Sequence, residues 1–274
     1  MPRTLKSLKT PLRYPGGKSK AVPKLLQYLP NLFQVKEFRE PFLGGGSVAL
    51  EITKRYPHID IWVNDLYEPL YNFWCELQHN GQELQDALLG IKSIYCNPDA
   101  ARCLFISSKE QINDSDLSNF DRAVAFYIVN KCSFSGLTES SSFSAQASES
   151  NFSTNGIERL TEYSEIIERW KITNLSYESM LCDDKDTFIY LDPPYDIKDN
   201  LYGRKGEMHK RFDHDKFAHD CDQHTCPMLI SYNSDQIIRD RFYEWTVGEF
   251  AHTYTMRSVG CYNIDQATRK ELVL

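Results

Sequence analysis

The chain has 274 residues and a net charge of −7, with 41% hydrophobic and 25% charged residues. This length is enough for one large core or for a core that carries an inserted domain. No apolar stretch reaches the roughly eighteen residues that a membrane helix needs, and no secretory signal pattern opens the chain. The eight cysteines follow no framework spacing. We therefore expect a cytoplasmic protein with reduced thiols and no membrane partner.

The acidic balance argues against a polyanionic partner, because phosphate contacts rely on Lys and Arg. The basic residues are nevertheless unevenly placed, with one group at the start of the chain and one after residue 195. These residues are Lys6, Lys9, Arg13, Lys18, Lys20 and Lys24, followed by Lys198, Arg204, Lys205, Lys210 and Arg211. A local basic face on an acidic protein can bind DNA, and solvated surface charge is the equally good alternative.

The first informative stretch is Tyr14-Pro15-Gly16-Gly17-Lys18. Two glycines precede a helical pattern over residues 21–29, so their N–H groups open toward an anion at the start of a helix. Lys18 would add a positive charge there. The alternative is an ordinary Pro-Gly turn.

A second glycine loop lies between a predicted strand that begins at Glu37 and a predicted helix over residues 48–56. Its sequence is Glu40-Pro41-Phe42-Leu43-Gly44-Gly45-Gly46-Ser47. The spacing is neither G-x-G-x-x-G nor a P-loop. Three consecutive glycines let a ligand lie directly on the backbone, which suits an adenosyl group better than a pyrophosphate. A flexible glycine turn is the alternative.

The second predicted strand, residues 59–63, leads to Asp65. An acid at this point, about twenty residues after a glycine loop, is well placed to bind ribose hydroxyls. Capping of the next helix is a compatible role for the same side chain.

Strand and helix stop alternating between residues 70 and 165. Helices are predicted over 69–77, 82–91, 100–106 and 120–129, and a serine-rich loop over 133–155. Long loops in compact proteins are usually functional or disordered, and we expect this one to face the substrate. It follows an apolar helix that contains Tyr127 and Asn130.

The sheet pattern resumes after a predicted helix over 157–170. Strands are predicted over 171–175, 187–191, 228–232, 245–250 and 271–274, with helices over 213–221 and 235–243. Glu178 could accept a hydrogen bond from an adenine amine or be a solvated loop acid. The pattern predicts an α/β fold in which residues 1–69 and 166–274 form one catalytic domain and 70–165 an inserted, mainly helical domain.

The tetrapeptide Asp192-Pro193-Pro194-Tyr195 follows the most apolar of these strands. The prolines exclude both ladder pairing and helix, so the carboxylate is held at the carboxyl end of a strand, where open α/β sheets bind ligands. Asp192 and the Pro193 carbonyl can each accept a hydrogen from one NH2 group while Tyr195 stacks on a planar ring. A Pro-Pro turn with a capping Asp is the alternative.

A group of histidines and cysteines after residue 208 raises the question of a metal site. Its members are His209, His214, His219, Cys221, His224 and Cys226. Tetrahedral zinc sites usually combine two pairs of closely spaced ligands, and this spacing forms no such pattern. We expect no metal.

In their order and spacing, the two glycine stretches and Asp192-Pro193-Pro194-Tyr195 resemble the Dam-type, alpha-group DNA adenine methyltransferases. Further similarities are Asp65, the Phe126–Asn130 stretch with Ser135-Gly136-Leu137, and Ser231-Tyr232-Asn233. The resemblance runs from about residue 10 to the end of the chain. Three motifs in order are far more specific than any one of them.

The resemblance implies a Rossmann-like sheet that binds S-adenosyl-L-methionine and methylates the exocyclic N6 amine of adenine in double-stranded DNA, with base flipping. By position, the cofactor residues would be Tyr14, Gly16, Gly17, Lys18, Phe42, Gly44, Gly46 and Asp65, with Glu178 as a further candidate. The base would be held by Asp192, Pro193, Pro194 and Tyr195. We place DNA contacts at Asn130, Ser135, Glu139, Asn151, Arg204, Lys205 and Arg211.

One departure leaves the recognition sequence open. Dam enzymes that read GATC carry Arg-Tyr-Asn soon after Gly-Leu, whereas Gly136-Leu137 is followed here by Thr138-Glu139-Ser140-Ser141. The resemblance implies a prokaryotic or phage enzyme, monomeric, acting alone or within a restriction-modification system. The alternatives are methylation of RNA or of a protein amide, a dinucleotide-dependent oxidoreductase, or a non-catalytic DNA-binding relative.

Overall fold

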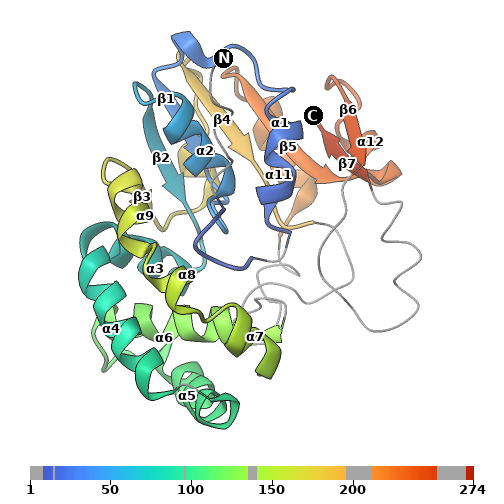
Figure 1. The fold of residues 1–274 in the computed structure, drawn as a ribbon. Helices are drawn as coiled ribbons and strands as arrows, with labels where there is room; N and C mark the ends of the chain where they lie inside the picture. Colours follow the sequence, from blue (N-terminus) through green and yellow to red (C-terminus); the bar gives the residue numbers. More distant parts are fainter. Residues whose placement is uncertain (1–8, 15, 96, 135–140, 196–211, 252–269) are drawn as a thin grey trace, which may run out of the picture.

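The computed structural model describes residues 9–14, 16–95, 97–134, 141–195, 212–251 and 270–274. Its centre is a seven-stranded sheet with the order β3-β2-β1-β4-β5-β7-β6 (Figure 1). The strands are β1 (Glu37–Glu40), β2 (Asp60–Asn64), β3 (Lys171–Thr173), β4 (Thr187–Leu191), β5 (Met228–Asn233), β6 (Gly248–Ala251) and β7 (Lys270–Val273). All of the predicted strands are present, which confirms the predicted α/β sheet.

The first five strands are parallel, and β7 runs antiparallel to both β5 and β6. β1 lies between β2 and β4, so the chain moves outward in opposite directions on the two sides of the β1–β4 pair. The carboxyl ends of two such strands border the crevice in which open α/β sheets bind their ligands. The sequence after β1 is the second glycine loop, and the sequence after β4 is Asp192–Tyr195.

Both faces of the sheet are covered, which explains why β4 is apolar throughout. Phe188 and Tyr190 belong to one buried cluster, and Ile189 and Leu191 belong to another on the opposite face. The flanking helices are α1 (Val22–Leu25), α2 (Ser47–Arg55), α11 (His214–Asp222) and α12 (Gln236–Arg241), with short 3-10 turns η1 (Lys18–Lys20), η2 (Leu32–Gln34) and η4 (Tyr177–Met180).

The chain between β2 and β3 is helical wherever the structure describes regular elements in it. These elements are α3 (Glu68–His79), α4 (Gly81–Ile94), α5 (Pro98–Gln111), α6 (Asn119–Cys132), α7 (Ala145–Ser150), α8 (Thr154–Ile157) and α9 (Leu160–Ile167). We call them the helical region. Figure 1 shows α4 to α7 gathered beyond one end of the strands. The core of the helical region is aromatic: Phe73 of α3 stacks on Tyr127 of α6, with 5.9 Å between the ring centroids. The predicted helical insertion is confirmed.

The prediction of a structureless loop over 133–155 is wrong for the residues that the structure describes. Ser144 and Ser153 accept hydrogen bonds from N–H groups at the starts of α7 and α8, so these serines end a loop and begin a helix. Phe143 packs against Phe105, and Phe152 is fully buried. These two aromatic side chains therefore contribute to the core and do not face a substrate.

No helix within the described ranges is long and apolar enough to cross a membrane. Within the same ranges, no cluster of three or more histidine, cysteine, aspartate or glutamate side chains could hold a metal ion. His209, the first member of the histidine and cysteine group, lies outside the described residues.

Candidate active site

The glycine loop after β1 has a conformation that requires glycine. Gly44 and Gly46 have φ angles of +50° and +67°, in the left-handed region that side chains disfavour. A Cβ on Gly44 would lie 2.8 Å from Cε1 of Tyr14, and one on Gly46 would lie 2.9 Å from Cζ2 of Trp74. Tyr14 is the first residue of the first glycine stretch, and its ring packs on the second glycine loop. The two glycine stretches of the sequence come together at one place.

Asp65 braces this loop from the end of β2. Its Oδ2 accepts the N–H of Gly44 at 2.9 Å, and its Oδ1 accepts the N–H of Tyr67 at 3.0 Å. The side chain is 8% exposed, and burial raises the pKa of Asp65 to about 6 in spite of the two backbone donors. One of these bonds reaches Tyr67, the residue just before α3, and the carboxylate also borders a pocket at the strand ends.

Asp192 stands at the end of β4 and is bound through one of its two oxygens. Lys18 Nζ lies 2.8 Å from Asp192 Oδ1, and Ser231 Oγ donates to the same oxygen at 3.0 Å. Desolvation by burial raises the pKa of Asp192, while the Lys18 ammonium acts in the opposite direction. The side chain remains 21% exposed, and no hydrogen bond from the described residues ends on Oδ2.

Lys18 and Tyr195 join the same buried group. The sequence assigns Lys18 to the cofactor, but its ammonium contacts Asp192, the Tyr195 hydroxyl and, at 3.1 Å, Glu271 Oε1. The Tyr195 hydroxyl donates to Glu271, and its ring stacks on Tyr232 with centroids 5.9 Å apart. Lys18 is thus a partner of the tetrapeptide in this structure.

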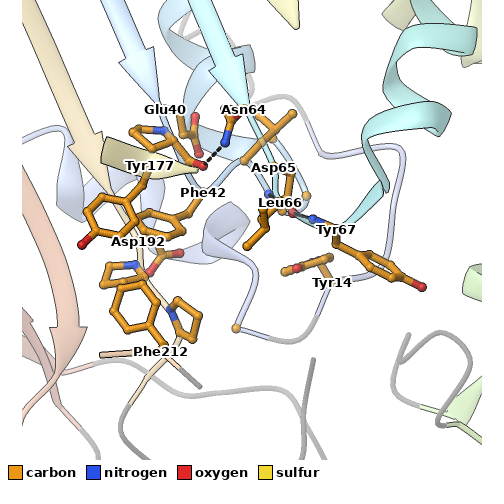
Figure 2. A pocket seen from close by; sticks show the side chains of 18 of the residues that line it. Tyr14, Glu40, Phe42, Asn64, Asp65, Leu66, Tyr67, Tyr177, Asp192 and Phe212 are labelled. Atoms are coloured by element: carbon orange, nitrogen blue, oxygen red, sulfur yellow. Dashed lines mark hydrogen bonds between the residues drawn. The ribbon is translucent and has the colours of Figure 1, made fainter. Parts of the chain in front are cut away.

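One pocket of about 320 Å³ connects the two strand ends. Figure 2 shows Phe42, Tyr177, Asp192 and Phe212 on one side of it and Asp65, Leu66 and Tyr67 on the other. Phe42 lies 5.7 Å from Tyr177 and 5.8 Å from Phe212 between centroids, so these rings form an aromatic wall. Every described lining residue comes from the stretches 14–67 and 175–216, and none comes from 70–165.

The rim of the aromatic wall is charged. Lys216 Nζ lies 2.8 Å from Glu178 Oε1 and 2.5 Å from Asp220 Oδ2, and Tyr177 donates to that same Asp220 oxygen at 2.7 Å. Burial by itself would raise the pKa of Glu178. Hydrogen bonds from Lys216 and Ser176 outweigh this effect, so the pKa of Glu178 is lowered. Glu178 therefore borders the pocket as an ionised and already paired carboxylate.

All of the predicted cofactor and catalytic positions line this one pocket. They are Tyr14, Gly16, Gly17, Lys18, Phe42, Gly44, Gly46, Asp65, Glu178, Asp192, Pro193, Pro194 and Tyr195. The pocket wall brings them together from five separate stretches of the chain.

Sequence reasoning missed several residues of the site. Glu40 is 3% exposed, lines the pocket and accepts the Ala49 N–H at 2.8 Å, and burial raises the pKa of this carboxyl well above its ordinary value. Its place as the last residue of β1, beside the glycine loop, was a usable signal. Ser231 lies in the Ser231-Tyr232-Asn233 stretch that the resemblance includes but was given no role, Tyr177 carries a weaker signal, and no motif surrounds Glu271.

The structure gives less support to the residues that the sequence assigns to DNA contacts. Asn130 is fully buried; its Oδ1 accepts the Arg13 N–H at 2.9 Å, and its Nδ2 donates to the Arg13 carbonyl at 2.6 Å. Both polar atoms of this side chain bond to the backbone just before the first glycine stretch, which argues against the predicted direct DNA contact by Asn130. Asn151 is half-buried at the end of α7. The remaining candidates Ser135, Glu139, Arg204, Lys205 and Arg211 lie outside the described residues.

Known proteins resemble this chain in sequence. A family model described as D12 class N6 adenine-specific DNA methyltransferase matches residues 14–256. The chain is 22% identical over 198 residues to the type II methyltransferase M.MjaIII of Methanocaldococcus jannaschii, which covers 67% of this chain and 68% of that protein. It is 28% identical over 189 residues to the DNA adenine methylase of Vibrio cholerae, covering 67% of this chain and 64% of that protein.

A structural match aligns with the whole of this chain and 92% of the rRNA methyltransferase aviRa of Streptomyces viridochromogenes, with a TM-score of 0.36 and 13% identity. The family model spans most of the chain, including both glycine stretches and the Asp-Pro-Pro-Tyr tetrapeptide. The chain therefore belongs to the D12 class of N6 adenine-specific DNA methyltransferases.

Proposed function

We propose that this protein transfers a methyl group from S-adenosyl-L-methionine to the N6 amine of adenine in double-stranded DNA, with Asp192 as the principal acceptor for that amine. The observation that carries the proposal is the single pocket in which the glycine loop after β1 and the tetrapeptide after β4 face each other. A methyl donor and its acceptor must meet in one enclosed space, and this pocket offers a wall for each.

The lining residues fit the cofactor. The aromatic wall of Phe42 and Tyr177 suits a purine ring, and the Asp65 carboxylate suits ribose hydroxyls. The absence of side chains at Gly44 and Gly46 lets Tyr14 and Trp74 pack directly on the loop, which lines the pocket with its backbone. S-adenosyl-L-methionine would supply an electrophilic methyl group on its sulfonium sulfur.

Asp192 and Pro193 would act on the amine of the target base. The nitrogen lone pair of adenine N6 is delocalised into the ring, so this amine is a weak nucleophile. A carboxylate oxygen and a carbonyl oxygen that each accept one hydrogen draw the amine toward tetrahedral geometry and localise the pair. Pro193 and Pro194 have no N–H groups that would compete for these acceptors.

Adenine reaches such a pocket only after leaving the duplex. Unstacking costs a few kcal/mol. Stacking of a base on an aromatic side chain returns about 1–3 kcal/mol. Tyr195 is held by its hydroxyl and by Tyr232, so its ring is fixed before the base arrives.

The grip on DNA is assigned to two places. The absence of helical-region residues from the described pocket wall fits a target-recognition role for residues 70–165. Arg204, Lys205 and Arg211, which follow the tetrapeptide in the chain, are assigned to phosphate contacts from the sequence alone. The recognition sequence stays open. A prokaryotic or phage origin fits the archaeal and bacterial relatives, of which one is named a type II methyltransferase. We propose that the enzyme acts as a monomer.

The competing substrates are RNA and protein amides, and the competing class is a dinucleotide-dependent oxidoreductase. In three parallel reactions, the protein is incubated with methyl-labelled S-adenosyl-L-methionine together with unmethylated plasmid, with total RNA or with protein. Digestion to nucleosides or amino acids then identifies the labelled product. We expect label in N6-methyldeoxyadenosine alone. Label only in a ribonucleoside or an amino acid, or no label with any substrate, would overturn the proposal.

A further inference from the structure

Glu271 is a completely buried acid in β7, far from the motifs in sequence but in contact with two of them. Its side chain is 0% exposed. Its Oε1 lies 3.1 Å from Lys18 Nζ and accepts the Tyr195 hydroxyl at 2.5 Å. β7 pairs with β5, which carries Ser231, so the strand that brings Glu271 also supports the other partner of Asp192.

The buried group of Lys18, Asp192 and Glu271 contains two carboxylates and one ammonium. Lys18 is 4% exposed and lies between the carboxylates of Asp192 and Glu271. Burial opposes its charge, but the two carboxylates outweigh burial and raise the pKa of Lys18 above its ordinary value. Among these three described side chains, one cation shared by two anions leaves a net charge of −1. The Glu40 carboxyl also faces Asp192 and Lys18, and burial raises its pKa well above the ordinary value. Without Glu271, Lys18 would neutralise Asp192.

The hydrogen bonds distinguish the two oxygens of Asp192. Lys18 and Ser231 both bind Oδ1, and Ser231 Oγ is itself 2.8 Å from the Tyr190 hydroxyl. None of the hydrogen bonds among the described residues ends on Oδ2. Of the three charged side chains, only Asp192 keeps substantial exposure, at 21%. The second oxygen of Asp192 is therefore the acceptor of the group to which no described donor is bound.

We infer that Glu271 is a positioning residue for methyl transfer: it shares the Lys18 ammonium, so that Lys18 does not neutralise Asp192 alone and Asp192 can present Oδ2 to the target amine. Glu271 also fixes the ring of Tyr195 through the same oxygen. Glu271 is not among the residues that line the pocket, and it acts through Lys18 and Tyr195. This inference rests on the proposed role of Asp192 in methylation.

Opposite pH shifts in two variants test the charge balance. Glu271→Gln keeps size and hydrogen-bonding capacity but removes a negative charge that raises the pKa of Asp192. The acidic limb of the kcat profile should therefore move to lower pH, with kcat at its plateau reduced about 10–100-fold, as for other groups that orient a reacting side chain. Lys18→Met removes the charge that lowers this pKa, so its acidic limb should move to higher pH.

The matched control is Glu249→Gln. Glu249 lies on the neighbouring strand β6 and is paired with Lys270 and Arg239 outside the pocket. This variant should keep the wild-type kcat and pH profile. Cofactor affinity, measured by calorimetry, should be unchanged in Glu271→Gln, which separates a kcat effect from a binding effect.

Unchanged kcat and pH profile in folded Glu271→Gln would overturn the inference, as would shifts of both variants in the same direction. If circular dichroism shows that Glu271→Gln is unfolded, Lys18→Met and the double variant Lys18→Met/Glu271→Gln decide. The double variant restores the net charge of −1, so its acidic limb should lie below that of Lys18→Met; coincident limbs would refute the charge balance. A wild-type protein that methylates no adenine would instead refute the proposed function itself.

Discussion

The sheet edge, by which we mean the carboxyl ends of the central strands around the pocket, and the helical region both bury polar side chains. The two regions use these side chains differently. At the sheet edge, Lys18, Asp192 and Glu271 bury charge that is shared among side chains and partly directed at a pocket. In the helical region, Asn130 and Asn72 are buried amides that bond to the backbone of neighbouring segments. Buried charge beside a cavity marks the site of chemistry, whereas buried amides bonded to backbone mark structural support.

The two regions meet at the glycine loop. Trp74 of α3 donates its indole N–H to the Gly44 carbonyl at 3.2 Å and packs against Gly46. At α6, Asn130 holds the Arg13 backbone, and the Arg13 guanidinium donates to the Ser133 carbonyl at 2.7 Å. The helical region therefore supports the pocket from behind without lining it. Substitutions on the two sides should have separable effects.

The largest expected effect is at the sheet edge. Asp192→Ala should reduce kcat by about 10²–10³-fold, the loss typical of one pre-organised electrostatic partner. Cofactor affinity should change little, because the glycine loop and Asp65 stay in place. Single-turnover methylation of plasmid DNA measures the rate. Asp186→Ala, at the other end of β4 and exposed, is the control. Turnover within a few-fold of wild type would remove Asp192 from the chemistry.

Asp65→Ala should weaken cofactor binding by about 1.5–3 kcal/mol, the range for hydrogen bonds that involve a charged group. Calorimetry with S-adenosyl-L-methionine measures this loss, and Asp60→Ala, at the exposed start of β2, is the control. Equal affinities for wild type and Asp65→Ala would exclude Asp65 from the cofactor site.

The affinity should also depend on pH. The folded-state pKa of Asp65 is about 6, so its carboxylate is lost as pH falls through that value. Hydroxyl donors of a ribose favour the ionised form, and wild-type affinity should therefore weaken from pH 7 to pH 5. Asp65→Asn should lack this trend between the same limits. A wild-type affinity that rises on acidification would contradict the assignment.

The smallest effect separates support from chemistry. Asn130→Ala removes two hydrogen bonds and leaves the Arg13 backbone groups without partners, which should lower the free energy of unfolding by about 1–3 kcal/mol. Urea denaturation measures the change. The set of methylated sequences, read by sequencing of plasmid DNA, should stay the same. A changed set with unchanged stability would return Asn130 to DNA recognition.

Local patterns account for what could be predicted from the sequence. The apolar run 187–191 and the two glycine stretches specify strands and turns through their own residues, and each is present as expected. Strand ends in a parallel sheet share one edge, so the order of the motifs along the chain is enough to place Asp192 near the glycine loop.

Other features depend on contacts between distant segments. Glu271 was out of reach because its role comes from β7 pairing with β5 and from Lys18, about 250 residues earlier in the chain. The burial of Asn130 could not be predicted, because a polar residue at the end of an apolar helix looks accessible until the Arg13 segment is seen to bond to it. Serines that cap α7 and α8 have the composition of a loop.

One pocket should hold the methyl donor against Asp192, and the most direct measurement is a crystal structure of the protein with S-adenosylhomocysteine, the demethylated cofactor. We predict electron density for this ligand in the pocket, with the purine against Phe42 and Tyr177 and the ribose at Asp65. Density for the ligand at any other surface, with the pocket unchanged, would contradict this placement of the methyl donor.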